Sequence, residues 1–257
     1  MLKTKFINPK LSIIIPSFNN LEQLKKCINS IQKQSYTNYE VYIIDGKSTD
    51  GTFEFLKSLS TPFYFISEED DGIYDAMNKG IELASGEWIY FLGVDDQLYD
   101  NDVLTNIMSL TNNTKIDLIF GDIEYDIDDN YPFIYSTTKK YKSSSWNWSI
   151  WIRNSVHHQG TFFRKSLFKQ NKYNTKYQIL ADYAFNLDLY KMNFPFVISP
   201  ICIAKCLSSG VSKKGNWNIY KEEIQLKTAA SSVILLPFFY LLAFIKFSMA
   251  WLIRERK

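Results

Sequence analysis

The segment Glu87-Trp88-Ile89-Tyr90-Phe91-Leu92-Gly93-Val94-Asp95-Asp96 is the one on which the fold prediction depends. Its apolar run has the length and composition of a buried β-strand, and it stops on two adjacent carboxylates. Two like charges held together raise each other's cost of ionisation, which a divalent cation or a sugar hydroxyl would relieve. Alternatively, Asp95 and Asp96 open a turn before Leu98 and cap the next helix.

Upstream of this segment, strand-like and helix-like patterns alternate. Compact apolar runs at residues 11–15, 40–44 and 63–66 predict strands. Asn20 and Gln23 predict a capping box for the first helix. The apolar faces of the predicted helices consist of Leu21, Leu24, Cys27, Ile28 and Ile31, then Phe53, Leu56 and Leu59, then Ile73, Met77, Ile81 and Ala84. This alternation predicts an α/β fold with a mostly parallel sheet flanked by helices on both faces.

Composition narrows the class of protein. The chain has 257 residues, of which 46% are hydrophobic, enough for one large folded α/β domain. The net charge of +2 comes with scattered basic residues, so no nucleic acid partner is expected. Three cysteines suggest a reducing compartment, and Cys202 and Cys206 lack the second pair of a zinc site. Residues 1–10 lack a signal-peptide core, so we expect a cytoplasmic catalytic body.

Polar residues follow all four predicted strands. They are Ser17 and Asn19, then Asp45, then the acidic run 68–71, then Asp95 and Asp96. Ligands of open parallel sheets bind beyond the carboxyl ends of the strands, so these groups predict a crevice suited to a nucleoside. The sequence contains neither G-x-G-x-x-G after the first strand nor G-x-x-x-x-G-K-[ST]. A nucleotide diphosphate would therefore need a metal ion on the carboxylates.

Each of these acids also has a structural interpretation. Asp45 could form an Asx-turn with Lys47. The run 68–71 could be a solvated loop, an interpretation that suits Glu68 and Glu69 best.

Four segments in combination resemble glycosyltransferase family 2 of the GT-A fold, and most closely its bacterial branch that builds surface polysaccharides. They are residues 13–19 (IIIPSFN), 45–52 (DGKSTDGT), 70–80 (DDGIYDAMNKG) and 91–96 (FLGVDD). The motifs cover roughly residues 10 to 125. The resemblance implies inverting transfer of a sugar from a nucleotide-diphosphate donor with Mg²⁺ or Mn²⁺.

The resemblance also assigns roles by position. Asp95 and Asp96 match the motif that meets ribose and metal, whereas Gly93 stands where many members have Asp, which leaves the ligand set open. Lys79 could instead be an ordinary exposed helix residue. The residues implied in the nucleoside pocket and its adjoining motif are Pro16, Ser17, Asn19, Asp45, Asp70, Asn78, Lys79 and Asp95.

The second half shows a strand at residues 117–120 and an antiparallel pattern at 124–136 around a turn at 128–130. We therefore predict a nucleotide-sugar half at 1–125, an acceptor half at 126–215 and a C-terminal helical segment at 216–257. Three tryptophans could stack on sugars, rest on lipid headgroups or anchor the core: Trp146, Trp148 and Trp151. The loop Ser208-Ser209-Gly210-Val211-Ser212 could close over donor phosphates.

The candidate reacting groups come from two further motifs. His158 begins H-Q-G-T-F-F-R, which resembles a donor-site motif of the family, so it is a candidate for the metal or diphosphate, or else a structural histidine. Arg164 ends that motif and could bind phosphate or form a structural pair. Asp182 opens a helix where many members have Glu-Asp and this chain has Ala181-Asp182, so by position it is the base that deprotonates the acceptor. The alternative for Asp182 is a helix N-cap.

The tail at 233–253 is apolar except for Lys246 and Ser248, and it has about the ~20 residues that a bilayer crossing requires. A lysine near the centre of a spanning helix costs roughly 2.5–3.5 kcal/mol. We therefore favour a kinked helix resting in the cytoplasmic leaflet, with a span or packing against protein as alternatives.

These features predict a non-processive inverting glycosyltransferase, since no Gln-x-x-Arg-Trp motif occurs. The donor would be a nucleotide-diphosphate sugar and the acceptor a saccharide or lipid-linked molecule, at the inner face of the cell membrane. The competing interpretations are a non-catalytic carbohydrate- or nucleotide-binding relative and, more distantly, a nucleotidyltransferase.

Overall fold

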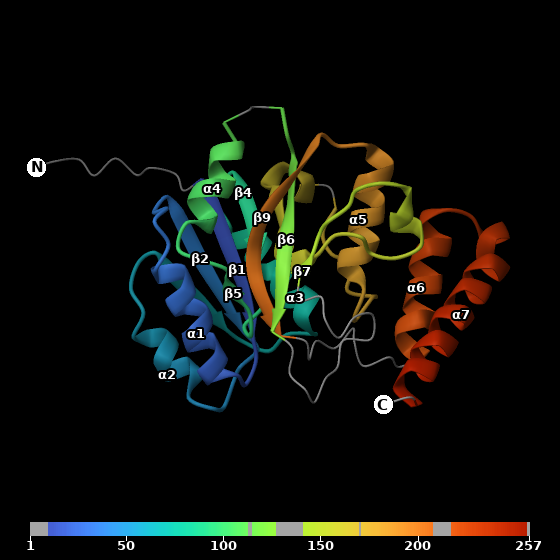
Figure 1. The fold of residues 1–257 in the computed structure, drawn as a ribbon. Coiled ribbons are helices and arrows are strands. Elements are labelled where there is room, and N and C mark those ends of the chain that lie inside the picture. The colour runs from blue at the N-terminus through green and yellow to red at the C-terminus, as the bar shows by residue number, and fades with distance from the viewer. Residues whose placement is uncertain (1–9, 113–114, 127–140, 170, 208–216, 256–257) are drawn as a thin grey trace, which may run out of the picture.

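The computed structural model describes residues 10–112, 115–126, 141–169, 171–207 and 217–255. Its centre is one nine-stranded sheet in the order β3-β2-β1-β4-β8-β6-β9-β5, with β7 paired to β6. Helices cover both faces of this sheet, and a helical pair, α6 and α7, stands to one side (Figure 1). The predicted α/β class is confirmed.

The first half of the sheet is parallel, as predicted. It consists of β1 (Leu11–Ser17), β2 (Tyr39–Asp45), β3 (Phe63–Ser67) and β4 (Trp88–Phe91). The register aligns the last residues of three of them, Ser17 with Asp45 and Asp45 with Ser67. All four strands therefore deliver the polar residues that follow them to one edge.

The second half is mixed. β8 (Thr161–Arg164) runs antiparallel to β4 and to β6 (Leu118–Asp126), while β9 (Phe196–Leu207) runs parallel to β6. The short strands β5 (Gln97–Leu98) and β7 (Tyr141–Lys142) pair antiparallel with β9 and β6. Pairing of β6 with β7 agrees with the predicted antiparallel pattern, whose turn at 128–130 lies outside the described residues.

Two apolar cores lie on opposite faces of the sheet. One core packs under α1 (Leu21–Gln32), α2 (Thr52–Lys57) and α4 (Val103–Leu110). The other packs under α3 (Ile73–Leu83) and α5 (Ala181–Met192). In β1, Ile13 and Ile15 belong to the first core and Ile14 to the second. A continuous apolar run thus fits a strand buried on both faces.

Some local predictions were wrong. Asn20 makes no side-chain cap for α1, and the Leu21 N–H instead donates to Asp50 Oδ2 at 2.8 Å. Asp50 Oδ1 also accepts from the Thr52 N–H at 3.2 Å, so one carboxylate satisfies the starts of two helices. On α3, Ile73 is exposed, and Tyr74 is the buried residue of that first turn.

Short 3₁₀ segments and a helical pair complete the chain. The 3₁₀ segments are η1 (Trp148–Trp151), η2 (His158–Gly160), η3 (Lys165–Phe168) and η5 (Val233–Leu235). Trp146 is buried against Phe120 and Phe196, which makes it a core anchor, whereas Trp148 is exposed. Helix α6 (Trp217–Ala230) contacts α5, and α7 (Leu236–Glu255) packs along α6.

Candidate active site

Asp45 is fully buried at the carboxyl end of β2. Its Oδ2 accepts from the Ser67 hydroxyl at 2.6 Å and from the Ser48 N–H at 3.1 Å, and its Oδ1 accepts from the Ser48 hydroxyl at 2.5 Å. The hydrogen bonds go to Ser48 and not to Lys47, so the Asx-turn interpretation was wrong. This carboxylate instead joins the ends of β2 and β3.

The neighbouring predicted pocket residues gather around the same turn. Asn19 adopts a left-handed backbone (φ 47°), and its Oδ1 accepts from the Thr49 N–H at 2.8 Å. A Cβ on Gly46 would lie 2.8 Å from Asp70 Oδ2, so only glycine lets the Asp70 carboxylate approach this closely. Pro16 and Ser17 are buried at the end of β1, and Ser17 Oγ has no hydrogen-bond partner in the described part of the chain. An orphaned hydroxyl beside ordered acceptors is typical of a polar ligand site.

The Asp95–Asp96 pair converges over Gly93. A Cβ on Gly93 would lie 2.4 Å from Asp96 Oδ2 and 3.1 Å from Asp95 Oδ1, so the two carboxylates face one small space. Burial, and then the charge of Asp95, raise the pKa of Asp96 to about 7. Hydrogen bonds from Cys206, Gln159 and the Leu207 backbone oppose that rise.

Of the two structural roles suggested for Asp95 and Asp96, a turn and a helix cap, only the turn is present. The Asp96 N–H donates to the Gly93 carbonyl at 3.0 Å, so a turn does form. The cap residue of the next helix, α4, is Asp102, so Asp95 and Asp96 do not cap it.

A divalent metal fits Asp95 and Asp96 as a partial ligand set. Mg²⁺ is often held by one or two carboxylates together with substrate phosphates, and two carboxylates meet at Gly93. No group of three or more His, Cys, Asp or Glu side chains is arranged to hold a metal among the residues that the structure describes. The predicted ligand set of Asp95, Asp96 and His158 is therefore not assembled within the described residues, and His158 as a metal ligand stays a prediction.

Asp182 lies in the first turn of α5, one residue after the helix begins at Ala181. The N-cap residue is Leu180, so the N-cap interpretation of Asp182 was wrong. Its Oδ1 accepts from the Tyr74 hydroxyl at 2.9 Å, and its Oδ2 accepts from Asn154 Nδ2 at 3.2 Å. Two donors from separate elements fix this half-buried carboxylate, and neither is a cation.

His158 lies between Asp182 and the end of β4. Its ring stacks on Phe91 with centroids 4.9 Å apart, and its Nε2 is 2.8 Å from the Tyr173 hydroxyl. Burial lowers the pKa of His158, and the charge of Asp182 partly opposes that shift. A ring packed and bonded in this way favours the structural interpretation of this histidine.

Lys142 was missed by the sequence analysis. Burial and then the charge of Arg153 lower the pKa of Lys142 to about 8, while Asp182 and Cys206 favour its charged form. Cys206 also bonds Asp96, so Lys142 lies near one group of each carboxylate region. Nothing in the sequence pointed to it, because pairing of β7 with β6 brings it there.

Three other predicted residues are engaged in structural contacts. Asn78 donates to the Tyr173 carbonyl at 2.9 Å and accepts from the Tyr173 N–H at 3.0 Å. Lys79 is 3.0 Å from Glu68 and 3.3 Å from Asp75, so it is neither free nor fully exposed. Glu68 and Glu69 are exposed, as the loop interpretation expected.

Arg164 lies at the other end of the sheet from the carboxylates. It pairs with Trp88, the first residue of β4, and bridges Glu87 at 2.5 Å and Asp117 at 3.0 Å. Its phosphate-binding interpretation was therefore wrong, and the structural pair is confirmed.

The mixed α/β sheet with acids collected at one edge is similar to the fold of the GT-A class of glycosyltransferases. Residues 12–172 match the model of the family described as "Glycosyl transferase family 2". The chain belongs to glycosyltransferase family 2 and is a transferase. The family prediction is confirmed.

Similar proteins agree with this assignment. A "PGL/p-HBAD biosynthesis glycosyltransferase" of Mycobacterium bovis is 34% identical over 185 residues, covering 70% of this chain and 69% of its own. S. aureus TarS 1-349 in complex with UDP-GlcNAc has a similar fold, with a TM-score of 0.67 at 17% identity, covering 91% of this chain and 70% of TarS 1-349. The mannosyltransferase PcManGT from Pyrobaculum calidifontis, in complex with GDP-Man and Mn²⁺, has a TM-score of 0.61 at 17% identity, covering 96% and 74%.

Proposed function

We propose that this protein is an inverting, non-processive glycosyltransferase that moves a sugar from a nucleotide diphosphate to a saccharide or lipid-linked acceptor in cell-surface polysaccharide synthesis. The observation that supports it most is Asp182, a carboxylate fixed by two neutral donors and free of ion pairs in the described structure. A carboxylate positioned by neighbouring donors, without a paired cation, is suited by its geometry to act as a general base.

The donor half would bind the nucleoside at the carboxyl ends of β1 to β3. Asp70 would accept from the base and ribose, Asp45 would support the pocket by fixing Ser48 and Ser67, and the orphaned Ser17 hydroxyl would gain a partner. Asn19 would fix the turn after β2 through its bond to the Thr49 N–H, and Pro16 would line the pocket at the end of β1. UDP-GlcNAc and GDP-Man in the two structural neighbours support a nucleotide-sugar donor. Asn78 and Lys79 would act at the border of this pocket, through the contacts already described.

Asp95 and Asp96 would hold Mg²⁺ or Mn²⁺, and the bound ion would supply positive charge to offset that of the diphosphate leaving group. Mn²⁺ in the PcManGT complex supports this assignment. Lys142, whose charged form is favoured by Asp182 and Cys206, would supply a protein cation on the Asp182 side of the site.

Asp182 would take the proton of the acceptor hydroxyl. The acceptor oxygen then bonds to the anomeric carbon while the bond from that carbon to the diphosphate oxygen breaks, which inverts the configuration. Tyr74 and Asn154 orient the carboxylate, and His158 packs beside it. Residues 1–125 would form the donor half, residues 126–215 the acceptor half, and residues 216–257 the attachment to the inner leaflet of the cell membrane.

The test uses the purified full chain with a panel of nucleotide sugars and Mn²⁺, followed by release of nucleoside diphosphate. Asp182→Asn should reduce turnover by about 10²–10⁴-fold, the usual size of general-base catalysis, with unchanged donor affinity. Asp188→Asn, the same change on the same helix, is the matched control and should retain turnover. Release of pyrophosphate instead would indicate nucleotidyl transfer, and full activity in Asp182→Asn would overturn the proposal.

A further inference from the structure

Helix α7 carries a large apolar surface that the rest of the described chain does not cover. Residues 233–252 form a stretch long and apolar enough to cross a membrane, and only 17% of it is buried. Exposed large apolar side chains in this stretch are Val233, Ile234, Leu235, Phe238, Tyr240, Leu241, Phe244, Ile245, Met249, Trp251 and Leu252. Contiguous exposed apolar surface of this kind marks an interaction site.

One narrow side of α7 does face protein. Phe239, Ala243 and Ala250 are buried, and the first two pack with Tyr220 and Ile224 of α6. Their spacings of four and seven residues make one stripe on the helix, so the remaining circumference stays open.

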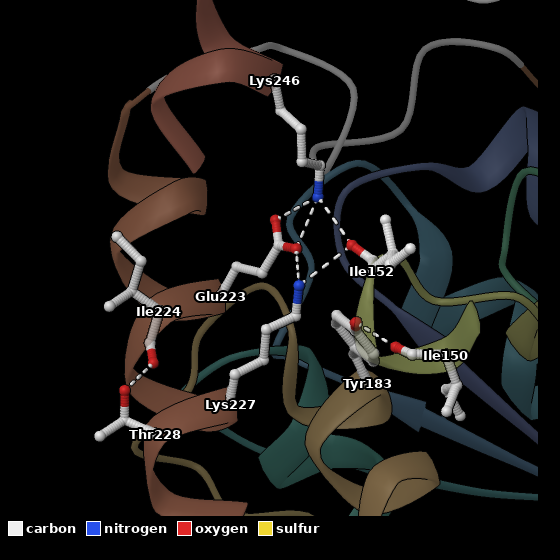
Figure 2. A network of polar contacts seen from close by, with 8 residues as sticks. All are labelled: Ile150, Ile152, Tyr183, Glu223, Ile224, Lys227, Thr228 and Lys246. Carbon is white, nitrogen blue, oxygen red and sulfur yellow. Dashed lines mark hydrogen bonds and ion pairs between the residues drawn. The ribbon is translucent and has the colours of Figure 1, made fainter. Parts of the chain in front are cut away.

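Lys246 is the one charged residue of 233–252, and it points toward the protein (Figure 2). Its Nζ lies 2.5 and 2.7 Å from the two carboxylate oxygens of Glu223 on α6 and 3.3 Å from the Ile152 carbonyl. The charge that argued against a membrane segment in the sequence is therefore removed from the exposed surface.

Glu223 is shared with a second lysine. Lys227, 1% exposed, places its Nζ 2.5 Å from Glu223 Oε1 and 3.0 Å from the Ile152 carbonyl. Figure 2 shows both ammonium groups converging on Glu223 and on the loop after η1. We call Glu223, Lys227 and Lys246 the clasp, because it joins α6, α7 and the catalytic body.

We propose that the exposed face of α7 lies in the interface of a phospholipid bilayer, parallel to its surface, and that the clasp fixes how the catalytic body meets the membrane. This rests on the proposed function, which places the protein at a membrane. A crossing would require α7 to leave α6, which would separate Lys246 from Glu223 and carry a lysine into hydrocarbon. A monotopic helix keeps the clasp and buries only the apolar face.

The charge at the end of the chain favours lipid as the partner. The sequence continues past the apolar stretch with Arg254, Arg256 and Lys257 against one acid, Glu255. Basic residues beside an interfacial helix are attracted to anionic headgroups. A second copy packed parallel along α7 would bring the same positive ends together and repel.

The first experiment is flotation of the full chain with phosphatidylcholine vesicles, with and without phosphatidylglycerol. We expect binding that is several-fold stronger with the anionic lipid. The double variant Leu241→Asp/Phe244→Asp should lose vesicle binding at least tenfold, and its far-UV circular dichroism should be unchanged because both residues are exposed. Met192→Asp, a matched charge on an exposed apolar residue of α5, should bind as the native chain does.

Nucleoside-diphosphate release measured without lipid separates this proposal from the proposed function. The double variant should keep that activity, so loss of binding alone addresses the membrane face. Undiminished flotation of the double variant would overturn the proposal. So would a lipid-free dimer that conceals the face and does not float.

The second experiment determines the side of the membrane. A protease-sensitive tag after Lys257 should be cleaved from outside in vesicles to which the protein was added, on the same side as the catalytic body. Protection of the tag would mean that α7 spans the bilayer and would overturn the parallel arrangement. Lys246→Leu, which removes the charge and leaves the Glu223–Lys227 pair, should increase protection if the clasp is what keeps α7 at the surface. No change in protection with that variant would refute the role of the clasp.

Discussion

Two charged clusters of this protein are strongly buried, and they differ in composition. Asp95 and Asp96 meet over Gly93 as two acids. Glu223, at the junction of α6 and α7, meets two lysines at 2.5 Å each (Figure 2). The first cluster contains acids alone, whereas the second contains both signs of charge, with one carboxylate shared by two lysines.

The pKa shifts express the same difference. Burial and the like charge of Asp95 raise the pKa of Asp96 to about 7. Burial lowers the pKa of Lys227 to about 8, and Glu223 opposes the shift while Lys246 adds to it. A buried charge that lacks its counter-ion is available to a ligand, whereas a charge that is already paired holds elements together. Asp95 and Asp96 therefore suit ligand binding, whereas Glu223, Lys227 and Lys246 join structural elements.

The largest expected effect is on the free energy of unfolding, and it comes from replacing Glu223, the acid that Lys227 and Lys246 share. Glu223→Gln leaves two buried lysines without a carboxylate, and breaking a buried pair costs about 3–5 kcal/mol. Urea unfolding of the full chain should show this loss. Lys246→Met leaves a neutral Glu223–Lys227 pair and should cost clearly less. Equal losses in the two variants would mean that Glu223 is not the centre of the cluster.

The next largest effect is the pH dependence of stability that the buried Asp96, beside Asp95, should cause. The folded pKa of Asp96, about 7, lies above the unfolded value near 3.9, so between these values the folded state binds more protons. Its contribution to stability is therefore fully present below about pH 4, falls as pH rises toward 7, and is constant above. Asp96→Asn should remove this slope from the pH dependence of the melting temperature.

The affinity for a metal ion should rise with pH, whereas the contribution of Asp96 to stability falls. Protons compete with Mn²⁺ for Asp96, so the affinity measured by calorimetry should rise up to about tenfold per pH unit below 7 and then level off. Asp102→Asn, which changes the exposed cap of α4, should leave the profile as it is. A flat profile in the native chain would show that Asp96 does not bind the ion.

A smaller effect is expected at the fixed carboxylate. Tyr74→Phe removes the donor at 2.9 Å from Asp182 and keeps the aromatic ring. A misoriented base should lower turnover by about tenfold, equivalent to about 1.4 kcal/mol, and leave the donor KM unchanged. Tyr177→Phe, another tyrosine of the same core, is the control. A rise in donor KM without a change in turnover would place Tyr74 in the nucleotide pocket instead.

The sequence was informative where local pattern determines structure. Strands β1 to β4 are apolar runs that end on polar residues, and parallel pairing necessarily places those ends at one edge, so Asp45 and Asp95 could be located in advance. Asp182 was predicted to open a helix, and it lies in the first turn of α5.

Contacts between distant segments could not be read in this way. Lys142 reaches the site only because β7 pairs with β6, and Asn154 holds Asp182 from 28 residues away. The α1 cap comes from Asp50 rather than from Asn20, because the turn after β2 packs against the start of that helix. The sequence counted Lys246 against a bilayer-spanning helix but could not show that it pairs with Glu223, which lies 23 residues earlier on another helix.

The smallest effect is expected at Arg164, which is ion-paired and lies at the end of the sheet away from Asp95 and Asp96. Its guanidinium bridges Glu87 and Asp117 and lies 4.9 Å from the Trp88 ring. Arg164→Lys keeps the charge and loses the fork and the stacking, so we expect a loss of about 1 kcal/mol in urea unfolding. Donor KM should stay within twofold, because Arg164 lies beside the first residue of β4 and the carboxylates follow its last. A threefold or larger rise in donor KM with unchanged stability would indicate that Arg164 binds the donor phosphates. In that case an ion-paired cluster would also serve as a ligand site, and the comparison between paired and unpaired clusters would fail.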